Sequence, residues 1–176
     1  MLSTNNITIR NEQLSDHHAT EALALAAFAP DERVAELVRK LRVSDALIPE
    51  LNLVAEVDGV LVGHLMFSQA RLTSGHTLAL LSPLGVLPAY QRRNVGSTLV
   101  HHALSWLRKS HFPVVVLQGV PSYYPRFGFT SAQAMGIEPP FALPESVWQA
   151  YRLPAYREDV VGKVTYPEPF DFLGTE

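Results

Sequence analysis

Apolar and polar residues alternate near the start of the chain, and the pattern then changes to a longer period. Ile7 and Ile9 alternate with polar neighbours, which predicts a short β-strand. Within 19–27 the apolar residues recur at helical spacing, and Ser15 or Asp16 can cap the start of that helix. The chain is therefore expected to open with a strand followed by a helix.

The next segments predict a second helix and a hairpin. Within 34–41 the apolar residues form one helical face beside charged residues, so a helix is expected soon after Asp31. The β-rich runs 51–57 and 60–72 flank Asp58–Gly59, a dipeptide typical of tight hairpin turns because both central positions need positive φ. Two antiparallel strands are the expected result.

The centre of the chain predicts a βαβ unit. Residues 78–87 are strand-like, but Pro83 cannot donate to a sheet ladder, so the strand is expected to bulge or lose its pairing there. Apolar residues recur four apart through 95–107, the clearest helical pattern in the chain. The apolar run 113–117 is typical of a strand covered on both faces, and this order of elements predicts a parallel, right-handed crossover.

Shorter elements are expected in the last third of the chain. Residues 123–129 predict a short helix ended by Gly128, residues 144–151 a short helix opened by proline, and residues 160–166 a last strand. A length of 176 residues suits one domain and is short for two, so we interpret 1–176 as a single domain.

Composition and charge narrow the class of protein. The formal net charge is -3 without any block of like charge, which argues against a nucleic-acid partner or an acidic membrane surface. No cysteine is present, so disulfides and a thiolate nucleophile are excluded, and a cytoplasmic location is expected. We expect no secretory signal before Gln13, and the apolar stretch 78–90 is too short and too rich in proline to span a bilayer.

The turn before the helix at 95–107 is the first place where chemistry can be inferred. A helix start leaves amide N–H groups without partners, and the helix dipole favours an anion there. Arg92 and Arg93 add cationic donors, and Gly96 lets a ligand approach the backbone closely. These features suit a pyrophosphate, although a basic turn with one glycine is more often only a solvated cap.

The strand before this turn adds a second feature. A bulge at Pro83 would free backbone groups of Leu84, Gly85 and Val86 to pair with an extended ligand that carries amides. Pantetheine is such a ligand, and its pyrophosphate end would then lie toward the helix start. Alternatively, Pro83 only marks an edge strand.

Two segments resemble the GNAT superfamily of acetyl-CoA-dependent N-acetyltransferases. The pyrophosphate-binding segment of that family reads Gln/Arg-x-x-Gly-x-Gly/Ala, and this chain has Gln91-Arg92-Arg93-Asn94-Val95-Gly96 after an apolar strand end. A second family element, Tyr-x-x-Phe/Leu-Gly-Phe, is matched by Tyr124-Pro125-Arg126-Phe127-Gly128-Phe129 after the next strand. Asn94 replaces the first glycine, and asparagine tolerates left-handed φ better than most residues. The order of elements is similar from end to end.

The resemblance implies an α/β (α+β) fold. This fold has a mixed, mostly antiparallel central sheet of about six or seven strands, a βαβ unit, a splayed or bulged fourth strand, and helices on both faces. The resemblance also implies acetyl-CoA as co-substrate and direct transfer of its acetyl group to an amine in a ternary complex. The expected acceptor is a small molecule or a protein or peptide amine, and the expected assembly is a monomer or a homodimer.

The resemblance also implies roles for residues. Tyr124 would donate to the departing CoA thiolate, since a phenol of pKa about 10 is protonated at neutral pH and can donate to a thiolate of pKa about 8.5. Tyr123 is its adjacent competitor, and backbone N–H groups of Leu84 or Val86 would stabilise the oxyanion of the attacked thioester. The expected cofactor-binding residues are Leu84, Gly85, Val86, Gln91, Arg92, Arg93, Asn94, Val95, Gly96 and Ser97.

The general base is not evident in the sequence. Many members of the family carry a carboxylate on the fourth strand, but none is present between Thr77 and Tyr90. Glu56, His64 and His76 fall on or between strands that can line the acceptor cleft, and water is a further alternative.

Other functions compete with the enzyme. The missing carboxylate favours a non-catalytic acyl-CoA-binding sensor or interaction module of the same fold. A dinucleotide site is disfavoured because the chain lacks GxGxxG, and a serine hydrolase because it lacks GxSxG. The adjacent pairs His17–His18 and His101–His102 point about 100° apart on a helix, so no metal site is expected.

Acceptor specificity is expected to reside in the segments 29–51 and 132–157. Four aromatic residues of the second segment could form an acceptor wall or a dimer contact, with core packing as the simpler reading. They are Phe141, Trp148, Tyr151 and Tyr156.

Overall fold

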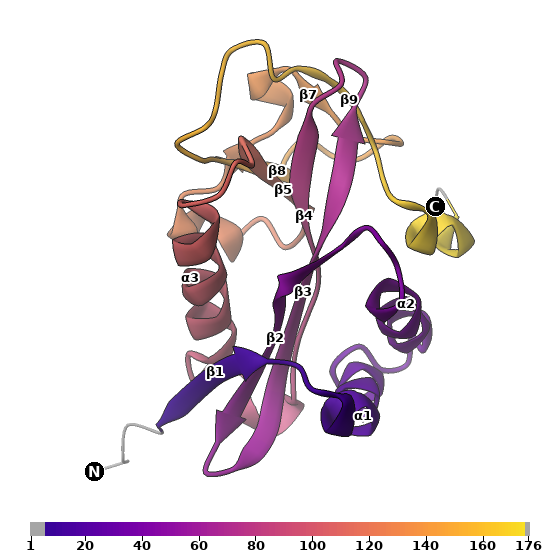
Figure 1. Cartoon of the computed structure of the whole chain (residues 1–176), viewed down its shortest axis with the longest axis vertical. Helices are drawn as coiled ribbons and strands as arrows, with labels where there is room; N and C mark the ends of the chain where they lie inside the picture. Colours follow the sequence, from indigo (N-terminus) through magenta and orange to yellow (C-terminus); the bar gives the residue numbers. More distant parts are fainter. Residues whose placement is uncertain (1–5, 175–176) are drawn as a thin grey trace. The chain divides into compact units, whose positions relative to one another are not determined.

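The computed structural model describes residues 6–174, which form three α-helices, nine β-strands and five short 3₁₀ helices (Figure 1). In chain order they are β1 (Ile7–Asn11), η1 (Leu14–Asp16), α1 (His17–Ala27), α2 (Arg33–Arg42), β2 (Leu47–Val57), β3 (Val60–Leu72), β4 (Thr77–Val86), η2 (Pro88–Tyr90), α3 (Val95–Leu107), β5 (Val114–Gln118), η3 (Tyr124–Phe127), β6 (Thr130–Ser131), η4 (Gln133–Met135), β7 (Ile137–Glu138), β8 (Trp148–Arg152), β9 (Gly162–Thr165) and η5 (Glu168–Leu173). The chain divides into two compact units, residues 1–67 with 82–104 and residues 68–81 with 105–176, so β3, β4 and α3 contribute to both.

The first unit has the strand order β1-β2-β3-β4, with α1 and α2 on one face of the sheet and α3 on the other (Figure 1). Strand β1 is antiparallel to β2, beginning with Ile7 opposite Val57. In the β2–β3 hairpin Asp58 has φ 51° and Gly59 has φ 77°, both positive as predicted. The predicted opening strand, two helices and hairpin are confirmed.

The start of α1 differs from the prediction in its capping. Asp16 occupies the N-cap position, but its side chain makes no hydrogen bond to the helix. The carboxylate instead accepts hydrogen bonds from Arg10 at 2.7 and 2.9 Å and from the Gln13 amide at 2.7 Å. The predicted cap is therefore wrong, because a bidentate ion pair with Arg10 takes the carboxylate away from the helix.

In the second unit β5, β8 and β6 follow β4 in that order. Strand β5 is parallel to β4, with Ala79 opposite Val115 and Leu80 opposite Val116, and antiparallel to β8. The pairing between β4 and β5 is short, which agrees with the predicted splayed fourth strand. Strand β4 continues through Pro83, and the peptide bond between Ser82 and Pro83 is cis. Strand β9 pairs with β3 and with β7.

The predicted fold class is confirmed. The sheet is mixed and mostly antiparallel, and β4, α3 and β5 form the predicted parallel βαβ unit. The strands among the described residues exceed the predicted six or seven because β6 and β7 are two residues long each, too short to produce a recognisable alternation.

The prediction of a helix at 144–151 is wrong, because the segment contains strand β8. Pro144 begins only one turn, in which its carbonyl accepts a hydrogen bond from the Val147 amide at 3.0 Å. The chain then pairs antiparallel with β5, with Trp148 opposite Gln118 and Ala150 opposite Val116. The proline signal is local, whereas pairing with a buried strand satisfies the backbone of the whole segment.

Helix α3 packs closely onto β3 at a glycine. A Cβ on Gly63 would lie 2.8 Å from Val95 Cγ1, 3.0 Å from Leu99 Cδ1 and 3.2 Å from Ala55 Cβ. A side chain here would collide with the Val95 and Leu99 side chains, at least one of which would have to move, and a glycine inside a strand signals such a close approach. Gly63 therefore sets the distance of the α3 start from the sheet.

We predict that Gly63→Ala lowers the free energy of unfolding by about 1–3 kcal/mol, since the new methyl overpacks the contact with Val95 and Leu99. Urea denaturation measures the change. Adding Val95→Ala should recover part of the loss, because it opens the crowded space. A Gly63→Ala protein as stable as the wild type would contradict this packing.

Candidate functional site

The turn between β4 and α3 lies in the first unit and carries most of the predicted cofactor-binding residues. After η2 the Gln91 side chain folds back, and its Nε2 donates to the Val86 carbonyl at 3.2 Å. That carbonyl, expected to be free for a ligand, therefore has an intramolecular partner. The Arg93 guanidinium lies 5.7 Å from the centre of the Tyr90 ring, and Arg92 and Arg93 are exposed.

The backbone of this turn contains two left-handed residues. Arg92 has φ 60° and Asn94 has φ 64°, whereas Arg93 between them keeps a negative φ. Such an alternation is typical of a nest, a concave anion site in which successive N–H groups turn toward one side. Asn94 adopts the left-handed conformation that asparagine tolerates better than most residues, whereas the same conformation at Arg92 has no signal in the sequence.

The start of α3 presents further N–H groups. The Thr98 amide donates to the Asn94 carbonyl at 2.9 Å, and the Thr98 hydroxyl donates to the same oxygen at 2.6 Å. The amides of Val95, Gly96 and Ser97 precede this first helical hydrogen bond, so no carbonyl of the helix pairs with them. Together with the nest and the exposed arginines, they form a row of donors suited to a diphosphate.

The end of β4 packs against α1 at a second close contact. A Cβ on Gly85 would lie 3.0 Å from Leu23 Cδ2 and 3.2 Å from Phe28 Cε2. Leu84 and Val86 are half-exposed and point to the other face, because side chains alternate along a strand. Gly85 is therefore required by packing with α1, a structural reason beside its predicted cofactor role.

Tyr124 lies in the second unit, where η3 follows β5. Its ring fills the space where Gly119 would carry a Cβ, and its centre lies 5.0 Å from that of Tyr123 and 5.8 Å from that of Phe129. Burial raises the pKa of Tyr124 well above its ordinary value, and Tyr123 adds to the effect. The phenol is therefore protonated at neutral pH and suited to donate. The Arg126 guanidinium lies over the ring of Tyr123, the alternative proton donor, at 4.4 Å from the ring centre.

A pocket of about 480 Å³ adjoins the Tyr124 segment within the second unit. Gln149 Nε2 donates to the Gly119 carbonyl at 3.3 Å, while its buried Oε1 has no partner among the described residues. The pocket thus lies beside an unpaired hydrogen-bond acceptor. Its lining residues are Pro121, Pro125, Phe129, Thr130, Ser131, Glu145, Ser146 and Gln149.

Two of the three candidate bases have other partners. Arg10 donates to Glu56 at 2.6 and 3.2 Å, so this carboxylate is engaged in an ion pair. His76 Nε2 lies 3.4 Å from an Asp159 oxygen. Strands β4 and β5 are parallel, with Ala79 opposite Val115. His76 precedes this pair and Gly119 follows it, so the two residues lie roughly 20 Å apart along the strand direction. His76 is therefore remote from the Tyr124 end of β5.

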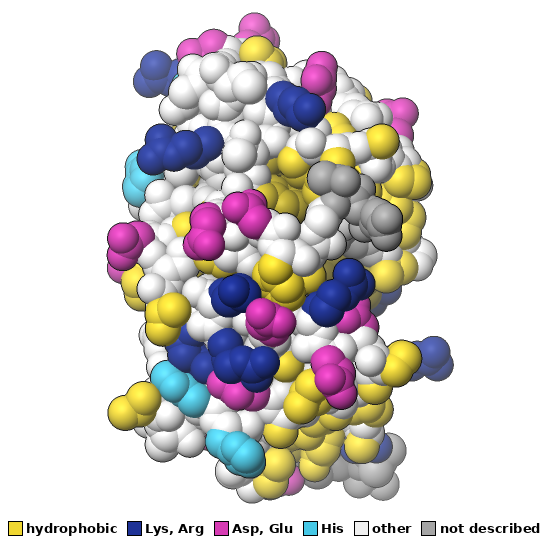
Figure 2. Space-filling view, turned by 90° about the vertical axis from the view of Figure 1, so that its right-hand side faces the viewer, with side chains coloured by type: hydrophobic (Ala, Val, Ile, Leu, Met, Phe, Trp, Pro, Cys, Tyr) yellow, Lys and Arg dark blue, Asp and Glu magenta, His cyan; other side chains and the backbone are white. Residues whose placement is uncertain are grey.

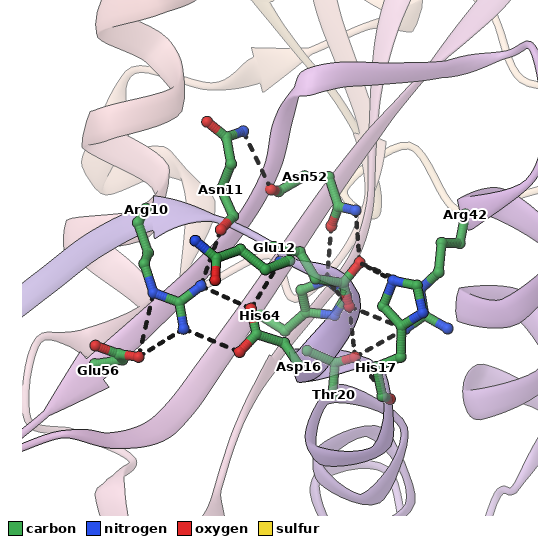
Figure 3. Close-up of polar contacts among 11 residues, drawn as sticks. Arg10, Asn11, Glu12, Asp16, His17, Thr20, Arg42, Asn52, Glu56 and His64 are labelled. Carbon is green, nitrogen blue, oxygen red and sulfur yellow. Dashed lines mark hydrogen bonds and ion pairs between the residues drawn. The ribbon is translucent and has the colours of Figure 1, made fainter.

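The third candidate, His64, belongs to a buried polar cluster in the first unit (Figure 3). Its Nε2 lies 2.8 Å from Asn52 Oδ1, and Asn52 Nδ2 donates to Glu12 at 2.7 Å. Arg42 and Thr20 donate to the same carboxylate at 2.9 and 2.6 Å. Because the Asn52 amide nitrogen faces Glu12, its oxygen faces His64, and this arrangement assigns the imidazole proton to Nε2.

The charges of this cluster follow from burial and hydrogen bonding. Burial acts to raise the pKa of Glu12, but hydrogen bonds from Arg42 and Thr20 outweigh it and lower that pKa to about 2. Burial lowers the pKa of His64 to about 4, against the opposing effect of Glu12. At neutral pH the cluster holds a carboxylate, a guanidinium and a neutral imidazole. It ties α1 and α2 to the sheet, and a buried imidazole of such low pKa is a poor general base.

Figure 2 shows acidic and basic side chains interspersed on one face of the molecule, without a broad field of one sign. Within residues 6–174, no three side chains of histidine or carboxylate type are grouped as metal ligands. None of the helices in that range has the length and apolar composition that a bilayer crossing requires.

Comparison with known proteins identifies relatives over most of the chain. Residues 14–129 match the model of the acetyltransferase (GNAT) family. The uncharacterized N-acetyltransferase YhbS of Escherichia coli strain K12 is 32% identical over 167 residues, which cover 93% of this chain and 98% of that protein. The uncharacterized N-acetyltransferase YjhQ of the same strain is 31% identical over 142 residues, 77% of this chain and 78% of that protein.

Two solved structures are similar over nearly the whole chain. The crystal structure of Escherichia coli YhbS in complex with CoA has a TM-score of 0.86 and 29% identity, covering 97% of this chain and 95% of that one. The structure of a GNAT family acetyltransferase from Brucella melitensis in complex with acetyl-CoA has a TM-score of 0.78 and 30% identity, covering 95% and 99%. The fold described above is thus the fold of these proteins.

The buried cluster generates a prediction for stability against pH. The pKa of His64 is about 4 in the folded protein and about 6.5 in the unfolded chain. The unfolded chain therefore binds more protons between these values, and the stabilisation present above pH 6.5 is lost as the pH falls toward 4. Between pH 7 and 5 the free energy of unfolding should fall by up to about 1.4 kcal/mol per pH unit from this group.

Urea denaturation at a series of pH values measures this slope. His64→Gln should flatten it, while His18→Gln, at an exposed position, should keep the wild-type slope. An unchanged slope in the His64 variant would show that another group carries the dependence.

Proposed function

The chain belongs to the GNAT family of acetyltransferases, and we propose that it transfers the acetyl group of acetyl-CoA directly to an amine within a ternary complex. The observation that carries this proposal is the row of unpaired amides at Val95, Gly96 and Ser97, next to the left-handed residues Arg92 and Asn94. Relatives of 29 and 30% identity crystallised with CoA and acetyl-CoA support the same ligand here.

The pyrophosphate of the coenzyme would accept hydrogen bonds from this row. The helix dipole and the exposed Arg92 and Arg93 side chains would balance its charge. These donors are mainly backbone groups, so Asn94 can replace the family's glycine as long as it keeps its amide in place. Gln91 supports the turn from the side by holding the Val86 carbonyl.

The thioester would lie along the end of β4. A backbone N–H of Leu84 or Val86 would donate to its carbonyl oxygen and stabilise the oxyanion that forms on attack. Loss of one such donor costs about 3 kcal/mol in comparable sites. A backbone feature can therefore be catalytic even though the strand has no carboxylate.

The reaction requires a group that protonates the leaving sulfur and a group that accepts the protons of the amine. The amine nitrogen bonds to the carbonyl carbon and forms the oxyanion; its collapse then breaks the carbon–sulfur bond, and the leaving thiolate takes a proton from the Tyr124 hydroxyl. Tyr124 regains a proton from water, and the protons released by the ammonium pass to water. Water is the proposed acceptor because Glu56 is ion-paired, His64 is buried and His76 is remote from Tyr124.

We predict that acetyl-CoA or CoA raises the melting temperature by several degrees, since a ligand at a hundred times its Kd adds about 2.7 kcal/mol of stability. Gly96→Glu should abolish this shift, because a carboxylate would occupy the anion site. Thermal denaturation measures it, with ATP and NAD as control ligands. His102→Glu adds the same charge on an exposed turn of α3 and should retain the shift. A full shift in Gly96→Glu would place the coenzyme elsewhere.

We predict that Tyr124→Phe keeps the melting shift with CoA but lowers kcat, because it removes the proton donor for the thiolate and leaves the ring packing intact. Release of free CoA in the presence of amines measures turnover. Tyr123→Phe is the matched control and should keep wild-type kcat. Equal rates for wild type and Tyr124→Phe would remove Tyr124 from the mechanism. CoA binding without acetylation of any amine would favour the sensor function.

A further inference from the structure

At the end of β5 the two faces of the sheet hold different functional side chains. Gly119 directs its missing side chain toward the Tyr124 ring, so Tyr124 lies on the face of Gly119. Gln118 precedes Gly119 and points to the opposite face, because side chains alternate along an extended chain. Trp148 lies directly opposite Gln118 on β8, and its ring centre is 6.3 Å from that of Tyr166. The second face therefore holds Gln118, Trp148 and Tyr166.

Gln118 is held in one orientation by Tyr166. The Tyr166 hydroxyl and Gln118 Oε1 lie 2.8 Å apart. Burial raises the pKa of Tyr166 well above its ordinary value, so the phenol is protonated and acts as the donor. The Gln118 oxygen is thereby occupied, and no described residue accepts from its Nε2. An exposed amide N–H₂ group with a defined direction remains.

Aromatic rings adjoin this amide. The Tyr166 ring centre lies 6.1 Å from that of Phe141, edge to face, and 5.2 Å from that of Phe170. Phe141 and Tyr166 are half-buried, so part of each ring remains open to a ligand. Trp148, whose ring adjoins that of Tyr166, is fully buried, and its Nε1 donates to the Ile137 carbonyl at 2.9 Å. The Tyr166 ring therefore packs against a tryptophan that is held in place by burial and by this hydrogen bond.

We propose that Gln118, oriented by Tyr166, recognises the acceptor, an amine that carries a neutral carbonyl oxygen and an apolar group, as an amino-acid amide or a peptide N-terminus does. This inference rests on the proposed function. Tyr124, the proposed acid for sulfur, occupies one face of the end of β5, which leaves the other face, where Gln118 lies, to the acceptor. The Gln118 N–H₂ donates to the carbonyl oxygen, and Phe141 and Tyr166 contact the apolar group.

Calorimetry with the CoA-saturated protein tests the inference with L-phenylalaninamide and phenethylamine, at a pH at which both are ammonium ions. The two share the amine and the ring, but phenethylamine lacks the carboxamide. We expect the amide to bind about tenfold more tightly, the size of one satisfied hydrogen bond. Gln118→Leu should remove the preference, whereas Gln133→Leu, at an exposed position of η4, should keep it.

Tyr166 is a positioning residue in this scheme, so its effect should pass through Gln118. Tyr166→Phe should reduce the preference in the wild-type background and change nothing further in the Gln118→Leu background. Equal binding of the two ligands to the wild type, a preference that survives Gln118→Leu, or no binding of the amide would each overturn the inference. If CoA still shifts the melting temperature and amines still release free CoA from acetyl-CoA in any of these cases, the proposed function stands without this inference. Loss of the melting shift or of CoA release refutes the function itself.

Discussion

The close contact of α3 with β3 at Gly63 is the constraint on which the candidate coenzyme site depends. The site consists mainly of backbone amides, and a backbone group lies where its helix and its turn place it. Because Gly63 has no side chain, Val95 packs directly onto the sheet and the free amides after Asn94 begin at a fixed height above β3. Arg92 and Asn94 lie in the turn that precedes these amides. Their left-handed conformations suit the turn to add its own N–H groups to the same set of donors.

On the other face of this sheet, α1 and α2 are attached by a charged cluster around Glu12. A buried carboxylate is costly unless each oxygen is satisfied, and Glu12 meets this condition through Arg42, Thr20 and Asn52. These donors come from three different elements, so the pairing joins α1, α2 and β2 at one point. The same cluster keeps His64 neutral and occupied. His64 is thus explained as a structural group, and water is our proposed proton acceptor.

The end of β5 organises the second unit in a similar way. Gly119 admits the Tyr124 ring on one face, and Gln118 on the other face is oriented by Tyr166, a residue 48 positions later in the chain. Burial keeps both phenols protonated, but one lies beside the proposed leaving group and the other fixes an amide. The alternation of side chains along a single strand therefore separates the proposed proton donor from the proposed acceptor contact.

The sequence by itself determined the elements whose patterns are long or chemically distinctive. Helix α3, the hairpin at Asp58–Gly59, the parallel βαβ unit and the basic turn before Gly96 are all visible because local periodicity and turn chemistry produce them. Only the tertiary structure decided matters that depend on partners distant in sequence. Residues 148–152 form a strand because β5 offers unsatisfied backbone groups, and Asp16 binds Arg10 instead of capping α1. Likewise, His64 is enclosed by Glu12, Asn52 and Arg42, and no periodicity encodes which side chains meet in a folded core.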